Sequence, residues 1–304
     1  MPCRLLRTLA WLMVMTISFS ACTPAATSSS QDSSLTSGAS SGSASVQTES
    51  LPEDASAAPV AAIPEPKPKL TPQDIDEALS AVMEDYTAAA VSVATIEQGE
   101  VSQAGAWGWA VKDQREMTAD TKLRVASISK VAIAMCAMAM AEDGLVDLDA
   151  PLSAYWGEGA VNPYSQTQPS IRTLMSHTSS LKDLEITWGL SRLQGIMNSS
   201  SSWRNMEPGD SGDWYYSNFG FCVLGTTLEL AADRLLDDYL QERFLQPMGI
   251  RATFYSGNME EDEVATLYTT GGIGRSAAEH AGQTVPTEIG MGASYYPGGF
   301  TVSA

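Results

Sequence analysis

The chain has 304 residues, of which 36 are acidic and 17 basic, giving a net charge of −19. This acidic balance disfavours nucleic acid as a partner, because phosphates require neutralisation by cationic side chains. Four cysteines without a CxxC pair and only two histidines cannot be assembled into the spacing of a zinc or haem site, so we expect no metal and no other cofactor.

The first 22 residues have the pattern of a secretory signal segment. Two arginines precede an apolar run over residues 9–19, which is too short for a dependable membrane span. Small residues stand directly before Cys22, as in a bacterial lipobox, although Phe19 is unusual at its position. We expect export and lipidation of Cys22 at the outer face of the bacterial cell membrane. An ordinary signal peptide that is cut nearby, giving a secreted protein, is the alternative.

Residues 23–69 are rich in Ser, Ala, Thr and Pro and show no apolar periodicity. Such a segment cannot bury enough surface to offset its chain entropy. We predict a disordered tether that stiffens over the prolines of residues 64–68. The tether would hold a folded domain, residues 70–304, away from a membrane surface.

The folded part is predicted to begin with a helix and a hairpin. Thr71 is a candidate N-cap with Pro72 at the first helical position. Apolar residues then recur at helical spacing. They are Ile75, Leu79, Val82, Met83 and Tyr86. Residues 89–96 and 101–110 are typical of strands around a polar turn. A helix, a hairpin and a further helix suggest an α+β layout.

The next segment combines an uncharged helix with a serine and a lysine. No charged residue occurs over residues 131–141, and Gly144 is a candidate left-handed helix end. A helix that is apolar on every side is predicted to be buried. Ser127 and Lys130 stand at its N-terminal end, three positions apart. At this spacing the hydroxyl and the ammonium group share one helix face and can meet.

This pair suits nucleophilic catalysis. A serine hydroxyl becomes a good nucleophile when a neighbouring base takes its proton, and partial burial lowers the pKa of a lysine towards that task. The helix N-terminus favours negative charge that develops nearby. A solvated Lys130 and a capping Ser127 are the alternative interpretation. A second Ser-x-x-Lys match, Ser179 to Lys182, has no apolar helix behind it, and we interpret it as chance.

Other reactive side chains are interpreted as structural. Ser170 is predicted to cap a short helix that ends just before His177. A single histidine after a helix is interpreted as a hydrogen-bonding residue rather than a base. Cys136 and Cys222 lie in apolar helical stretches and are interpreted as small core residues, with a disulfide between them left open.

A tyrosine and an asparagine precede a second strongly apolar helix. This helix is predicted over residues 219–232, and an amphipathic one follows over residues 235–248. Tyr216 and Asn218 stand just before the apolar helix, so both side chains could point into one cleft. The alternative is that Tyr216 is a core residue and Asn218 a helix cap.

These motifs together resemble one known family. Ser127-Ile-Ser-Lys130 resembles the first motif of the serine β-lactamase and penicillin-binding-protein superfamily. Tyr216-Ser217-Asn218 is similar to the second motif in its class C β-lactamase and D-Ala-D-Ala carboxypeptidase branch. The resemblance runs from about Leu70 to the last residue. The connecting segments that resemble the same branch are residues 144–151, 174–181, 244–249 and 296–304.

The resemblance implies an α+β fold in which an antiparallel sheet flanked by helices faces an all-helical region across a cleft. It also implies acyl transfer through a serine ester. By this resemblance Ser127 is the nucleophile, and Lys130 and Tyr216 share the duty of general base. Asn218 would hydrogen-bond Lys130 and the substrate amide. These roles agree with a lysine beside a hydroxyl and with a phenol that ionises more easily beside a cation.

The sequence departs from the family pattern in two places. Ser180 stands where the family usually has glycine. The third motif, Lys-Thr-Gly or His-Thr-Gly, should follow Gly298 and Gly299 by many residues, but the chain stops at Ala304, and Thr269 to Gly271 lacks the basic residue. In the family, that strand supplies the second oxyanion N–H, whose loss costs on the order of 3–4 kcal/mol. We therefore predict a truncated copy of a longer protein, without its C-terminal strands, that folds poorly and turns over slowly.

The sequence thus predicts a membrane-tethered, extracytoplasmic serine hydrolase that forms an acyl-enzyme at Ser127. Its substrate would be a D-Ala-D-Ala peptide, a β-lactam or a small ester, and its other partner the membrane, reached through the lipid anchor. No nucleic acid is expected. The alternative is a non-catalytic lipoprotein that binds the cell wall with the same scaffold.

Overall fold

The computed structural model describes residues 71–157 and 159–304. The predicted signal segment with Cys22 and the predicted tether lie outside these residues. The chain divides into two compact units, residues 1–78 and 79–304, and each is described by itself. None of the helices in the described ranges has the length and apolar character needed to cross a membrane.

Helix α2 (Pro72–Asp85) begins in the first unit and has the predicted N-terminal cap. The Thr71 N–H donates to Asp74 Oδ2 at 2.8 Å, and the Asp74 N–H donates back to Thr71 Oγ1 at 3.2 Å. These reciprocal bonds satisfy backbone donors that the first helical turn leaves without partners. Tyr86 was expected on the apolar face of this helix, and that prediction is wrong. It follows the last helical residue and is exposed.

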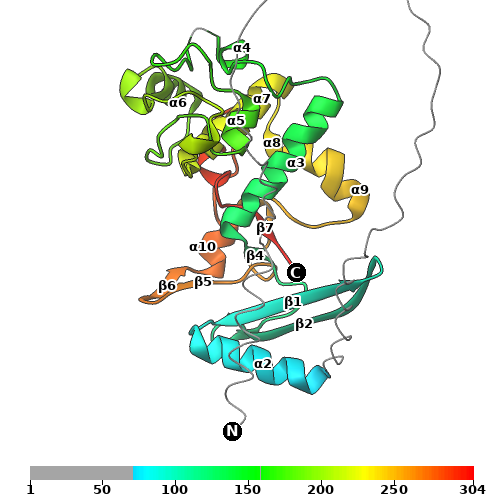
Figure 1. The fold of residues 1–304 in the computed structure, drawn as a ribbon. Helices are drawn as coiled ribbons and strands as arrows, with labels where there is room; N and C mark the ends of the chain where they lie inside the picture. The colour runs from blue at the N-terminus through cyan, green and yellow to red at the C-terminus, as the bar shows by residue number, and fades with distance from the viewer. Residues whose placement is uncertain (1–70, 158) are drawn as a thin grey trace, which may run out of the picture. The chain divides into compact units, whose positions relative to one another are not determined.

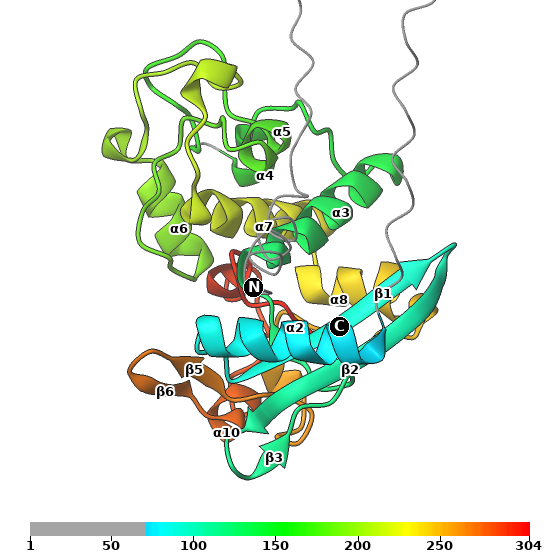
Figure 2. The same cartoon turned by 60° about the horizontal axis from the view of Figure 1, so that its bottom comes forward.

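After the end of α2, the second unit continues with an antiparallel sheet in the order β1-β2-β3, and Figure 2 shows β3 beside β2. Its strands are β1 (Ala90–Glu97), β2 (Glu100–Val111) and β3 (Arg115–Glu116). The predicted hairpin is confirmed. Its two turn residues, Gln98 and Gly99, have φ values of 54° and 86°. Left-handed conformations at both positions give a turn whose twist matches that of paired strands.

Two small antiparallel pairs follow in this unit, and one of them, β4–β7, joins segments that are far apart in the sequence. β4 (Leu123–Arg124) pairs with β7 (Thr301–Val302), and β5 (Leu267–Thr269) pairs with β6 (Gly272–Arg275). The β4–β7 pair continues into a hydrogen bond of 2.9 Å from the Val125 N–H to the Phe300 carbonyl. The residues just before β7 are therefore held against the residues that lead into helix α3.

The helices surround one large apolar core. α3 and α7 lie side by side in Figures 1 and 2, and α7 also contacts α4, α5 and α8. Their facing residues are fully buried, as at Ile133 and Met140 of α3 and Phe219 and Leu228 of α7. Burial of such side chains contributes roughly 1.5–3 kcal/mol each. The helices are α3 (Ser129–Glu142), α4 (Ser153–Trp156), α5 (Ile171–Met175), α6 (Leu190–Met197), α7 (Asn218–Ala232), α8 (Leu236–Leu240), α9 (Gln246–Met248) and α10 (Ala277–Ala281).

Several shorter helical turns complete the fold. The predicted amphipathic helix over residues 235–248 is present but divided, because a π-helical turn over Gln241–Leu245 separates α8 from α9. The 3₁₀ turns are Ala126–Ile128, Ser200–Ser202, Ser211–Asp213, Ser256–Asn258 and Ala293–Tyr295. The predicted α+β class is confirmed by this arrangement.

Helix α3 is not buried on every side, so that part of the prediction is wrong. Val131, Met135 and Met138 are 59%, 43% and 49% exposed. They are spaced by four and three residues and therefore share one helix face. Within residues 79–304, α7 and its neighbours cover the opposite face. An uncharged composition shows that a helix tolerates burial, but it does not show which faces are covered.

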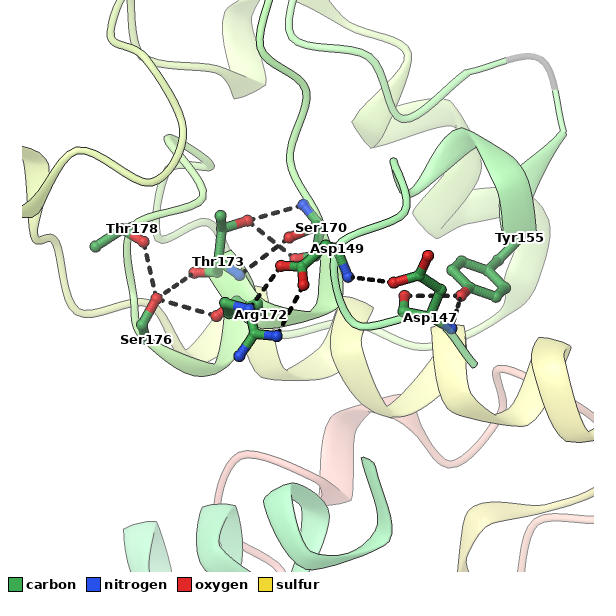
Figure 3. A network of polar contacts seen from close by, with 8 residues as sticks. All are labelled: Asp147, Asp149, Tyr155, Ser170, Arg172, Thr173, Ser176 and Thr178. Atoms are coloured by element: carbon green, nitrogen blue, oxygen red, sulfur yellow. Dashed lines mark hydrogen bonds and ion pairs between the residues drawn. The ribbon is translucent and has the colours of Figure 1, made fainter. Parts of the chain in front are cut away.

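A network of polar contacts lies around both ends of α5 (Figure 3). Ser170 caps α5 in a reciprocal capping box, which confirms the predicted cap. Arg172 donates to both carboxylate oxygens of Asp149 at 2.6 and 2.8 Å. Ser176 and Thr178 flank His177 in the sequence, and Ser176 Oγ lies 2.8 Å from Thr178 Oγ1. The exposed ion pair adds little stability, whereas the cap defines where the helix begins and the hydroxyl contact lies where it ends.

Cys136 and Cys222 are both buried and both free, so no disulfide joins them. Burial raises the pKa of each thiol to about 12. A thiol with such a pKa remains protonated at neutral pH and is a poor nucleophile. Both residues therefore act as small apolar side chains of the core, as predicted.

Candidate active site

Ser127 lies in the 3₁₀ turn Ala126–Ile128 that leads directly into α3. The preceding residue, Ala126, has a φ of 47°. A residue with a Cβ atom adopts this left-handed conformation at a cost of about 1–2 kcal/mol, and such strain is concentrated at functional sites. The strained turn leaves Ser127 exposed at the N-terminal end of a helix whose following residues, Ser129 and Lys130, are buried.

The structure brings together the four side chains that the sequence singled out. Ser127 Oγ lies 2.7 Å from the Tyr216 hydroxyl. Lys130 Nζ lies 3.3 Å from Ser127 Oγ and donates to Asn218 Oδ1 at 3.0 Å. Lys130 is only 8% exposed, so it is not a solvated lysine. Tyr216 is 38% exposed, so it is not a core tyrosine. The expected convergence is therefore present.

A backbone carbonyl completes the surroundings of Lys130. Lys130 Nζ donates to the Pro297 carbonyl oxygen at 2.7 Å. Sequence reasoning did not identify this acceptor, because a main-chain carbonyl has no side-chain signal. The pairing of β4 with β7 accounts for its place, since it holds the residues just before β7 beside the start of α3.

The lysine also determines the electrostatics of the phenol. Lys130 Nζ lies 5.0 Å from the centroid of the Tyr216 ring and 5.3 Å from that of Phe221. Burial opposes ionisation of Tyr216, but the contacts with Lys130 and Ser127 and the lysine charge outweigh it, so the pKa of the phenol is lowered. A phenol with a lowered pKa can take a proton from the neighbouring hydroxyl more readily.

The N-terminus of α7 positions the second motif. Ser217, rather than Asn218, is the N-cap, and its Oγ accepts from the Gly220 N–H at 2.8 Å. Asp183 Oδ1 accepts from the N–H groups of Asn218 and Phe219 at 2.7 and 3.0 Å. A carboxylate is favoured at this end of a helix. Sequence reasoning missed Asp183, because an aspartate in a loop 35 residues upstream carries no local signal.

His177 also contacts the second motif, Tyr216 to Asn218. Its Nδ1 accepts from the Ser217 N–H at 3.2 Å, and its ring centroid lies 4.5 Å from that of Tyr216. Burial, and then the charge of Lys130, lowers the pKa of His177. A neutral ring can accept the Ser217 N–H, whereas a protonated ring cannot. These contacts fit the predicted hydrogen-bonding role.

The second Ser-x-x-Lys match does not form a catalytic pair. Lys182 Nζ donates to the Ser201 carbonyl at 2.7 Å, and Ser179 Oγ accepts from the Leu181 N–H at 3.3 Å. Between them, Ser180 has a φ of 62°. This left-handed conformation accounts for the usual glycine at this position, since glycine adopts it without steric cost. The chain keeps the turn with serine in its place.

The backbone of Ser127 provides a candidate oxyanion donor. Over residues 71–157 and 159–304, the Ser127 N–H has no acceptor. It lies at the start of the turn that leads into α3, where the helix dipole favours negative charge. An N–H in this position can donate to the oxygen of a carbonyl under attack by the same residue.

Comparison with known proteins agrees with this geometry. The sequence model of the family described as Beta-lactamase matches residues 75–296. A D-aminopeptidase from Brucella anthropi is 30% identical over 185 residues, which are 56% of this chain and 33% of the relative. The chain therefore spans about a third of the length of the curated relatives that it matches.

Two solved structures show the same fold. The octameric penicillin-binding protein homologue from Pyrococcus abyssi has a TM-score of 0.62 at 19% identity and covers 76% of this chain and 53% of its own. The class C β-lactamase from Rhodobacter sphaeroides has a TM-score of 0.57 at 21% identity, with 75% and 61% covered. The family match extends over well over half of the sequence and includes Ser127, Lys130 and Tyr216. This chain therefore belongs to the β-lactamase family of serine hydrolases.

Proposed function

We propose that this protein hydrolyses an amide or ester bond through an acyl ester on Ser127. The observation that carries the proposal is the position of Ser127 Oγ, 2.7 Å from the Tyr216 hydroxyl and 3.3 Å from Lys130 Nζ. A hydroxyl in contact with both a phenol of lowered pKa and a buried amine has the activation that a serine nucleophile requires.

The reaction follows from the contacts around Ser127. Tyr216 and Lys130 together take the hydroxyl proton as Oγ attacks the substrate carbonyl. The Ser127 N–H stabilises the oxyanion. The proton then passes to the leaving amine or alcohol as its bond to the carbonyl carbon breaks, which leaves the acyl ester on Ser127. Water, deprotonated by the same base, cleaves this ester and regenerates the hydroxyl.

We propose a small amide or peptide with a D-configured residue as the substrate, a class that includes D-Ala-D-Ala peptides. The support is the similarity to D-aminopeptidases and the state of Asn218. Its Oδ1 accepts from Lys130, which leaves its NH₂ group for the carbonyl of a substrate amide. β-Lactams and small esters are the other substrates to compare, because each offers a carbonyl to the same nucleophile.

The test is covalent labelling of the full chain by a fluorescent fluorophosphonate and a fluorescent penicillin. We expect the wild type to gain one label, as measured by intact mass, and Ser127→Ala to gain none. Ser179→Ala is the matched control, because it removes the serine of the other Ser-x-x-Lys match and should label fully. Equal labelling of Ser127→Ala contradicts the assignment. Folded protein that is never labelled supports the non-catalytic cell-wall binder instead.

We also propose that the protein is exported and held at the outer face of the cell membrane by a lipid on Cys22. The support is the sequence alone: an apolar segment, small residues before Cys22, and the polar residues 23–69 that would act as a tether. In a bacterial host, the wild type should incorporate labelled palmitate and sediment with membranes. Cys22→Ala should do neither. Equal incorporation in both proteins would refute lipidation at this residue.

A further inference from the structure

A small cleft of about 240 Å³ lies beside the strand that precedes Ser127. It is bordered by β4, by β6 and by the turn Ala293–Tyr295. Every side chain that lines it carries at least one hydrogen-bond donor, and none is acidic. The lining residues are Arg124, Arg275, Gln283, Ser294 and Tyr295. Two arginines without an acid stand out in a chain of net charge −19.

Several of these donors have no acceptor among the described residues. Arg124 uses its Nε to donate to the Gly298 carbonyl at 2.5 Å, which leaves both Nη groups. The Gln283 Oε1 accepts from Ser256 Oγ at 3.0 Å, which leaves the NH₂ group of the amide. Within the part of the chain that the structure describes, the Arg275 side chain has no hydrogen-bond or ion-pair partner. Within residues 71–157 and 159–304, the cleft therefore offers several N–H groups without an acceptor, and no acidic side chain lines it.

The two positive charges are close enough to affect each other and their neighbours. Burial, and then the charge of Arg275, lowers the pKa of Arg124. Burial also lowers the pKa of His280, and both arginines add to that effect. The neighbouring acid, Glu279, does not line the cleft, because its carboxylate accepts from Ser276 at the N-terminus of α10. The hydrogen bonds from Ser276, and then the charge of Arg275, lower the pKa of Glu279, so this carboxylate balances part of the positive potential from outside the lining of the cleft.

We propose that this cleft binds an oxyanion, a carboxylate or a phosphate group, between Arg124 and Arg275. Guanidinium groups form short, paired, charge-assisted hydrogen bonds with such anions. A cleft of about 240 Å³ has room for the anionic group and a few attached atoms.

The place of the cleft links it to the active site. Arg124 precedes Ser127 by three residues, and its Nε donates to the Gly298 carbonyl. Gly298 follows Pro297, whose carbonyl accepts from Lys130. An anion in the cleft would thus contact both segments that position the nucleophile and its base. It could belong to the substrate or be a separate small molecule. Binding does not depend on the proposed hydrolysis, but a link to the substrate rests on it.

The first experiment is isothermal titration of the full chain with inorganic phosphate and with succinate, at constant ionic strength set by sodium chloride. We expect saturable binding at one site and an affinity about tenfold or more weaker in Arg275→Gln, because a charge-assisted pair is lost. Within the described residues Arg275 makes no hydrogen bond or ion pair and acts on Glu279 only through its charge, so this variant should keep a Tm close to that of the wild type. Arg172→Gln is the control, since Arg172 is exposed on α5 and pairs with Asp149. Binding that does not saturate, or equal affinity in Arg275→Gln, overturns the proposal.

A second experiment identifies the source of the anion. It compares acylation of Ser127 by two matched small esters, one with a free carboxylate and one with a carboxamide in its place. If the substrate supplies the anion, Arg275→Gln raises KM about tenfold for the carboxylate ester alone, and phosphate competes with that ester. If a separate molecule supplies it, phosphate binds without altering this preference. Should Ser127 never be acylated, the proposed function fails, while the titration still decides whether the cleft binds anions.

Discussion

Lys130→Met is expected to lower the rate of acylation of Ser127 by about 10²–10⁴-fold, the range that a positioned general acid or base contributes. Methionine has a similar length and no charge, so it fills the buried space of the lysine. It removes the donor to Ser127 Oγ, Asn218 Oδ1 and the Pro297 carbonyl. Stopped-flow labelling with the fluorophosphonate measures the rate, and Tm shows whether the variant is folded.

The pH dependence separates loss of the base from a general distortion. Lys130 is one cause of the lowered pKa of Tyr216, so its removal should move that pKa upward. The remaining acylation should then require more alkaline pH than in the wild type. Lys182→Met is the matched control, because among the described residues the Lys182 side chain donates only to the exposed Ser201 carbonyl, and this variant should keep both rate and profile. A folded Lys130→Met variant with wild-type rates would show that Lys130 takes no part in proton transfer.

Glu229→Ala is expected to lower the free energy of unfolding by about 3–5 kcal/mol, because each buried donor left without a partner costs about 1–3 kcal/mol. Glu229 is fully buried in α7. Its carboxylate accepts from the Gly290 N–H at 2.8 Å, from the Leu236 N–H at 3.3 Å and from the Tyr296 hydroxyl. For a unit of this size, Tm should fall by roughly 10 °C, as measured by differential scanning calorimetry.

Glu229→Gln is the control, since an amide keeps the shape and an acceptor oxygen. Burial raises the pKa of Glu229 above its ordinary value. The stability that protonated Glu229 gives the wild type is therefore fully present below the ordinary carboxyl pKa. It is lost as the pH rises through the higher pKa of the folded state. Glutamine does not titrate, so the Tm of the Gln variant should rise relative to that of the wild type as the pH increases between these two pKa values. A constant difference between the two proteins at all pH values would contradict the raised pKa.

Local patterns predicted much of the fold, and the errors concern tertiary contacts. The hairpin, the cap at Ser170 and the helix after Ser217 depend on neighbouring residues, so the sequence contains their determinants. The exposure of Val131 and Met138 depends on which elements cover α3. The composition of a helix does not show which elements pack against it. For the same reason, the helical spacing of Tyr86 did not predict that this residue is exposed.

The sequence predicted those parts of the candidate site that consist of side chains. Ser127 and Lys130 lie on one helix turn, so their contact follows from spacing. Tyr216 joins them from far along the chain, and only the family resemblance predicted that contact. The Pro297 carbonyl and the strained φ of Ala126 are backbone features. Nothing in the side chains of Pro297 or Ala126 specifies them.

The three contacts of Lys130 have a consequence for where the proton resides. Asn218 Oδ1 and the Pro297 carbonyl can only accept, so two N–H bonds of the amine always point at them. The third tetrahedral position faces Ser127 Oγ. It can hold a hydrogen that the ammonium donates or the lone pair of a neutral amine. In the proposed reaction the nitrogen would thus exchange one proton with the hydroxyl while every heavy atom stays in place, and reorganisation would add little to the barrier.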